Sequence, residues 1–205
     1  MTTQSLPITE TSYNSAADYG VYAEKMRTHK ELVSELRTEA RIDDEDLQAF
    51  KALVQKHGGA IHVSVMTEER CSDSATNLPI VEAIVKAVPG MDMKIFDMKQ
   101  YEELNAAYNA QGIDHIPVLT FFDAHWNLIG HWVERPAAAS KNLDAWKASH
   151  AETIRSLEAS GTLEGKRKLR ELYRGIADEM ATWYRGGLWS ETVREIRTVV
   201  ADGHL

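Results

Sequence analysis

The chain has 205 residues, of which 43% are hydrophobic and 26% charged, and its formal net charge is −8 at neutral pH. This composition is typical of a globular domain, whereas the acidic balance argues against nucleic acid as the main partner, because phosphate binding needs a basic face. The single cysteine excludes an intramolecular disulfide, so the chain needs no oxidising compartment to fold.

The N-terminal part of the chain is expected to be helical. Its first dozen residues are polar and predicted to fray, and they lack the basic and apolar segments of a secretory signal. Apolar residues near helical spacing predict a helix over about 16–40. A second helix is predicted after Asp43, a suitable N-cap, and should end at Gly58-Gly59, which permit a left-handed cap. We expect residues 1–58 to form an N-terminal helical extension.

Residues 59–158 alternate between strand and helix patterns. Strands are predicted near 60–66, 92–97, 117–123 and 126–133, and a helix follows each of the first two. Parallel strands joined through a helix need a right-handed crossover, and the last two strands form an antiparallel hairpin. The order predicts an α/β core with a four-stranded mixed sheet flanked by helices.

After Arg135-Pro136 the pattern is helical to the end of the chain. A helix near 141–158 is followed by a break at Gly161, and residues 159–205 are expected to form a C-terminal helical extension within one compact domain. The basic run at 166–168 is interpreted as a solvated helix face. The aromatic residues expected to fill the core of these helices are Tyr173, Trp183, Tyr184 and Trp189.

Three motifs surround the cysteine and the third strand. Cys71-Ser72-Asp73-Ser74 lies between a strand and a helix, Pro79 lies within that helix, and His115-Ile116-Pro117 precedes the third strand. These positions resemble the thioredoxin family, which has Cys-x-x-Cys, a helix-kinking proline and a cis-proline there. A bacterial group of thioredoxin family proteins is similar over about residues 16–150. Its motifs match Cys71-Ser72-Asp73, Asn77-Leu78-Pro79 and Trp132-Val133-Glu134-Arg135-Pro136.

The resemblance implies a thioredoxin-like fold with Cys71 as nucleophile, and two departures limit its chemistry. Ser74 stands where the family has its resolving cysteine, and Val65 stands where thioredoxins bury an acid. Release of a mixed disulfide needs a second thiol, so dithiol turnover by one chain cannot occur. A cis bond at Pro117 would leave the Ile116 backbone free to pair with an extended peptide. An ordinary trans proline opening an edge strand is the alternative.

The reactivity of Cys71 depends on its surroundings. A helix N-terminus favours the thiolate, Arg70 adds positive charge, and the Ser74 hydroxyl can bond to the sulfur, whereas the Asp73 carboxylate opposes ionisation. We predict an accessible thiol of lowered pKa, with Ser74 and Pro117 completing the catalytic group. Arg70, Asp73 and Ile116 are assigned to substrate binding. The alternative is a buried cysteine that packs as a small hydrophobe.

No cofactor or metal is expected. The histidines match no metal-ligand spacing, no phosphate-binding glycine loop is present, and Ser72-Asp73 differ from the Gly and Phe of cluster-binding monothiol glutaredoxins. We expect a cytoplasmic protein without a membrane partner, since no apolar run reaches the length of a span.

Three hypotheses for the function stay open. The first is a monothiol protein that exchanges with protein or small-molecule thiols and disulfides through Cys71. The second is a redox-silent module that holds a peptide or partner in the cis-proline groove. The third is a structural protein that forms a homo-oligomer through its terminal helices.

Overall fold

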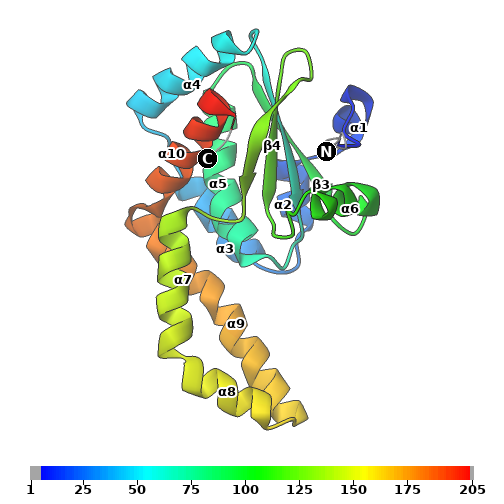
Figure 1. Ribbon diagram of the computed structural model, residues 1–205. Helices are drawn as coiled ribbons and strands as arrows, with labels where there is room; N and C mark the ends of the chain where they lie inside the picture. Colours follow the sequence, from blue (N-terminus) through cyan, green and yellow to red (C-terminus); the bar gives the residue numbers. More distant parts are fainter. Residues whose placement is uncertain (1–5, 204–205) are drawn as a thin grey trace.

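The computed structural model describes residues 6–203, in which a mixed sheet carries helices on both faces (Figure 1). The sheet order is β1-β3-β2-β4-β5. β2 and β3 are parallel, and the other neighbouring pairs are antiparallel. The predicted α/β core is confirmed, with one short strand more than expected. The strands are β1 Ala17–Asp18, β2 Ile61–Thr67, β3 Met91–Asp97, β4 Val118–Asp123 and β5 Leu128–Val133.

The helices follow the predicted order, with differences at both ends of the chain. A π-helical turn at Tyr184–Leu188 joins the last two. The helices are α1 Glu10–Ser15, α2 Tyr19–Lys25, α3 Lys30–Glu39, α4 Asp44–Lys56, α5 Ser72–Ala87, α6 Glu102–Ala110, α7 Ala137–Ser149, α8 Ala151–Ala159, α9 Leu163–Trp183 and α10 Trp189–Asp202.

The N-terminal segment differs most from the sequence-based expectation. The single helix predicted over 16–40 is wrong, because β1, α2 and α3 occupy that range. The helix stops where Met26 leaves the helical region and His29 adopts a left-handed φ of 59°. The expected fraying is also wrong for α1, which a capping box at Thr9 stabilises; residues 1–5 lie outside the described part. The N-cap predicted at Asp43 is confirmed, with its carboxylate accepting from Asp46 N–H at 2.8 Å.

The central strand β2 is buried from both sides, which fixes the position of its C-terminal end. Val63 and Val65 belong to the core shared with α3, α4, α5 and α10. Met66 belongs to the opposite core, together with Tyr13 of α1 and Tyr108 of α6. Because α5 starts just after β2, the sheet places Cys71 at the carboxyl edge of the two parallel strands.

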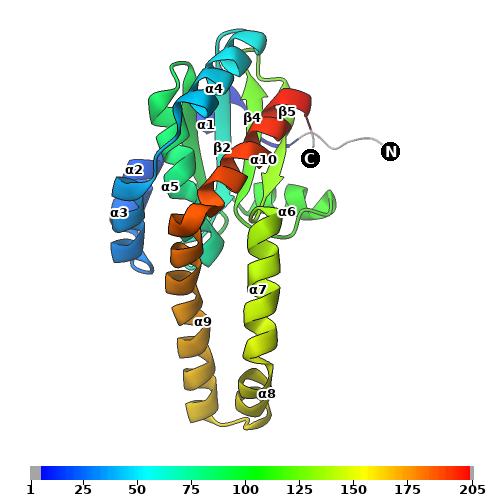
Figure 2. The same cartoon turned by 90° about the vertical axis from the view of Figure 1, so that its left-hand side faces the viewer.

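Helices α7, α8 and α9 extend away from the sheet as an arm (Figures 1 and 2). The helix predicted over 141–158 is divided at His150 into α7 and α8. Trp146, Met180 and Tyr184 form a small core between α7 and α9, whereas the expectation that Tyr173 is buried is wrong, since it is 42% exposed. None of the helices within residues 6–203 is long and apolar enough to cross a membrane.

Candidate functional site

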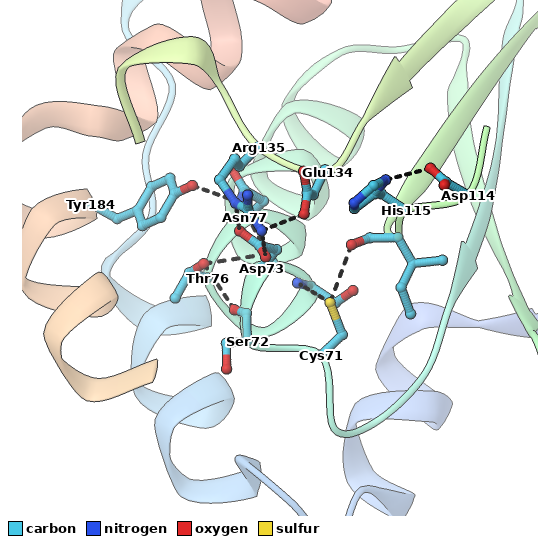
Figure 3. Close-up of polar contacts among 12 residues, drawn as sticks. Cys71, Ser72, Asp73, Thr76, Asn77, Asp114, His115, Glu134, Arg135 and Tyr184 are labelled. Carbon is cyan, nitrogen blue, oxygen red and sulfur yellow. Dashed lines mark hydrogen bonds and ion pairs between the residues drawn. The ribbon is translucent and has the colours of Figure 1, made fainter. Parts of the chain in front are cut away.

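Cys71 is the N-cap of α5 and faces the loop before β4 (Figure 3). Its Sγ accepts a hydrogen bond from the Ser74 backbone N–H at 3.4 Å, and its thiol donates to the Ile116 carbonyl at 3.3 Å. The peptide bond between Ile116 and Pro117 is cis. The fold therefore brings Cys71, Ser74, Ile116 and Pro117 together from two segments far apart in sequence, and it leaves Cys71 partly exposed.

Ser74 lies beneath Cys71 and is buried. Its hydroxyl oxygen accepts a hydrogen bond from the Thr67 hydroxyl at 2.6 Å. Val65, two residues before Thr67, is fully buried between Ile95 and Leu119. The interior behind Cys71 therefore carries hydroxyl groups and apolar side chains at the positions where the sequence lacks a second thiol and an acid.

The thiol of Cys71 is harder to ionise than a free thiol. Burial raises its pKa to about 11, the charge of Asp73 raises it further, and hydrogen bonds from Ser74 and the Asp73 backbone lower it. The predicted lowering of the pKa is therefore wrong. The amide contact at 3.4 Å does not offset the desolvation of the sulfur, and the exposed Arg70 forms no ion pair within residues 6–203. At neutral pH the group is a thiol, as its donation to Ile116 requires.

Asp73 pairs with Arg135, which follows β5. The guanidinium donates from Nε and Nη2 to the two carboxylate oxygens, each at 2.6 Å. Both side chains are mostly buried, at 10% and 13% exposure, and Glu134 also contacts Arg135. A bidentate pair of this kind holds both partners in place. The carboxylate that we assigned to substrate binding is thus occupied by another residue of the same chain.

Asn77, one turn further along α5, ties the start of this helix to the C-terminal helices. Its amide donates to the Asp73 carbonyl at 3.0 Å and to the Tyr184 hydroxyl at 2.7 Å, and its oxygen accepts from Thr192 at 2.8 Å. The Trp189 indole donates to the Thr76 carbonyl at 2.9 Å. The first turns of α5 are therefore bonded both to the π-helical turn that follows α9 and to α10.

A family model described as thioredoxin matches residues 16–147 of the chain. The chain belongs to the thioredoxin-like family. The match begins just before β1 and ends within α7, so most of the arm and α10 lie beyond it.

Two solved structures are similar to this thioredoxin-like chain over nearly its whole length. A protein of unknown function from Pseudomonas aeruginosa is 16% identical with a TM-score of 0.52, covering 93% of this chain and 95% of that one. An HIV epitope-scaffold is 14% identical with a TM-score of 0.55, covering 97% and 100%. At these identities the similarity shows the fold alone. No curated protein matches the chain.

Sequence reasoning missed the groups that hold the thioredoxin-like site in place. Arg135 and Asn77 were quoted only as motif positions, although the opposite charges of Asp73 and Arg135 in two motifs of one family were a signal for the pair. Tyr184 gave no local signal, because it lies 107 residues from Asn77.

His115 lies next to the site but is exposed, and its ring contacts Asp114 (Figure 3). No group of three or more His, Cys, Asp or Glu side chains within residues 6–203 is placed to hold a metal ion.

Proposed function

We propose that this thioredoxin-like chain is a monothiol protein that captures a partner as a mixed disulfide through Cys71. The observation that supports this most is the placement of the sulfur. Cys71 caps α5, lies 3.3 Å from the carbonyl before the cis bond at Pro117, and has Ser74 where a resolving thiol would stand. The partner is a protein or small molecule that carries a disulfide, and an external thiol completes the cycle.

The exchange step uses one thiolate and one disulfide. The Cys71 thiol first loses its proton to solvent, and its sulfur then attacks one sulfur of the partner disulfide. A new bond forms between Sγ and that sulfur, the partner bond breaks, and the other half leaves as a thiolate that takes up a proton. Cys71 is thereby oxidised and the leaving half reduced. The Ser74 hydroxyl cannot repeat the attack, so the adduct persists until another thiol arrives.

The raised pKa makes this capture slow at neutral pH. With a pKa of about 11, roughly one thiol in 10⁴ is ionised at pH 7. A thiolate of higher pKa is the stronger nucleophile, but this gain recovers only part of the loss. Each unit of thiol pKa raises the logarithm of the thiolate's rate constant by only about 0.4–0.5. We therefore expect slow formation of a long-lived adduct and negligible reductase turnover.

The test compares adduct formation with turnover. Intact mass after incubation with oxidised glutathione should show one adduct on the wild type, formed faster at pH 9.5 than at pH 7, and none on Cys71→Ser. Insulin reduction with a thioredoxin reductase as electron source should be negligible for the wild type. Ser74→Cys should gain a weak activity, since Val65 leaves the new thiol without a buried acid. Robust insulin reduction by the wild type would refute the monothiol mechanism.

A redox-silent binding module is the second candidate, and one contact favours it. The Cys71 thiol donates its proton to the Ile116 carbonyl, so at neutral pH it acts as a hydrogen-bond donor within the groove. In that case the wild type should form no adduct even at pH 9.5, while an extended peptide should bind the wild type and Cys71→Ser with the same affinity.

A further inference from the structure

A cleft of about 480 Å³ opens next to the loop that leads from β2 to Cys71. It lies between α2, the end of β3 and the loop that joins β2 to α5. Its walls include Tyr22, Glu69 and Asp97, and Met26 and Ile95 form apolar surface within it. The volume falls in the range of small-molecule sites, and the carboxyl ends of parallel strands are where open α/β sheets bind ligands.

Charges of both signs line this cleft without neutralising one another. Lys25 is exposed, and within residues 6–203 its ammonium forms no ion pair. Asp97 accepts a hydrogen bond from the Lys99 backbone N–H at 3.0 Å, and Glu69 accepts one from the Arg27 backbone N–H at 2.9 Å. Neither carboxylate has a cationic partner among the described residues. Lys99 also lines the cleft but pairs with Glu68 at 3.2 Å, so the cleft offers one unpaired cation and two anions to a ligand.

Tyr22 adds a polar group that the protein itself does not satisfy. Its hydroxyl is buried and has no hydrogen-bond partner within the described residues. An unsatisfied buried hydroxyl destabilises a protein, and such a group calls for an explanation. Burial raises the pKa of Tyr22, the charges of Asp97, Glu69 and Cys71 raise it further, and the nearby Thr67 hydroxyl lowers it. The hydroxyl is therefore within electrostatic range of the acids of the cleft and of the sulfur.

We propose that this cleft binds a small zwitterionic disulfide, one whose end carries both an ammonium and a carboxylate group, as an amino acid does. The ammonium group pairs with Asp97 and Glu69 and the carboxylate with Lys25, and a shift of the Tyr22 side chain that exposes its buried hydroxyl lets it donate to the ligand. The inference rests on the proposed function and names its substrate class. Glu69 lies two residues before Cys71 in the chain, so a ligand held at Glu69 can extend its disulfide toward the sulfur.

The first experiment measures binding without chemistry, in the Cys71→Ser chain, by ligand-observed NMR titration. The probes are cystine, cystamine with ammonium groups only, dithiodiglycolate with carboxylates only, and uncharged hydroxyethyl disulfide. We expect cystine to bind at least tenfold more tightly than hydroxyethyl disulfide. Cystamine and dithiodiglycolate, which carry charges of one sign only, should have intermediate affinities. Equal affinity for all four, or no binding of cystine, would overturn the proposal.

The second experiment assigns the binding to the cleft, again in the Cys71→Ser chain. Lys25→Met and Asp97→Asn should each weaken cystine binding about tenfold, through loss of one charge-assisted contact. The matched controls are Lys141→Met and Asp144→Asn, which remove exposed charges from α7 outside the cleft. Tyr22→Phe should weaken binding about fivefold. Affinities equal to those of the controls would contradict the assignment.

Adduct formation separates this inference from the proposed function. If cystine binds Cys71→Ser as expected but never modifies the wild type, the ligand class is supported and the exchange function fails. If the wild type forms adducts with all four disulfides at rates proportional to their rates with a free cysteine peptide, exchange is supported and the zwitterion site is refuted.

Discussion

The two sides of Cys71 differ in how completely their polar groups are paired. On the side of the arm, Asp73 is held by Arg135, and Asn77 bonds to Tyr184 and Thr192. On the side of α2, the Tyr22 hydroxyl has no hydrogen-bond partner within residues 6–203, and Lys25, Glu69 and Asp97 of the cleft form no ion pair there.

This difference separates structural groups from groups available to a ligand. Buried polar groups that are fully bonded stabilise one arrangement of the chain, whereas unsatisfied ones are retained at a cost to stability. We therefore expect substitutions on the arm side to act mainly on folding, and substitutions on the cleft side to act mainly on binding.

The largest effect should come from breaking the buried ion pair. Arg135→Met leaves the Asp73 carboxylate buried without its partner, and removal of one member of such a pair typically costs about 3–5 kcal/mol. Urea unfolding followed by circular dichroism should show this loss. Arg194→Met, which removes an exposed pair with Glu191, is the control and should leave the midpoint almost unchanged. A similarly small change for Arg135→Met would mean that the pair is not buried in solution.

The second largest effect on stability should come from removing the Tyr184 hydroxyl, on the side of the arm. Tyr184→Phe removes the group that accepts from Asn77 at 2.7 Å, so one amide hydrogen loses its buried partner. We expect a loss of about 1–2 kcal/mol in the free energy of unfolding, measured in the same urea series. An unchanged stability would show that Asn77 finds another partner and that the π-helical turn after α9 does not hold α5 through this bond.

The charge of Asp73 should be visible in the reactivity of the thiol. Iodoacetamide labelling of the wild type should speed up about tenfold per pH unit and level off only near pH 11, because the thiolate appears as pH rises toward the pKa of Cys71. Asp73→Asn removes a negative charge that raises this pKa, and it leaves the positive Arg135 nearby. Labelling at pH 8 should therefore become several-fold faster. A slower rate would show that Asp73 favours the thiolate.

The smallest effect on stability should come from the cleft. Tyr22→Phe removes a hydroxyl that bonds to nothing within the described chain, so the free energy of unfolding should stay within about 0.5 kcal/mol of the wild type or rise slightly. Differential scanning calorimetry beside Tyr184→Phe provides the comparison. Equal losses of stability in Tyr22→Phe and Tyr184→Phe would contradict the difference in hydrogen bonding between the two sides of Cys71.

Local signals in the sequence predicted the parts of the fold that short segments determine. The β-branched run of β2, the acidic cap at Asp43 and the glycines after α4 act within a few residues, and those boundaries were found. β1 was missed because two residues carry no periodic pattern. The break between α2 and α3 was missed because His29 adopts a left-handed conformation that few residues other than glycine adopt and that no local pattern signals.

The candidate site was predicted in its composition but not in its electrostatics. The resemblance placed Cys71, Ser74 and Pro117 together, since those positions are tied to the fold. The pKa of the thiol depends on how deeply the sulfur is buried and on where Asp73 points. Neither follows from spacing along the chain, and the same holds for a cleft assembled from α2, β3 and a loop.

The bonds from α5 to the C-terminal helices also set an order in time. The hydrogen bond from Asn77 to Tyr184 cannot form until the ribosome has added 107 more residues. At the usual rate of translation this takes about 5–20 s. The remaining sheet strands, β3 to β5, are made during that interval, while the first turn of α5 lacks its hydrogen bonds to the C-terminal helices. We expect the nascent thiol to react faster with oxidants than the thiol of the folded chain, until Tyr184 and α10 are in place.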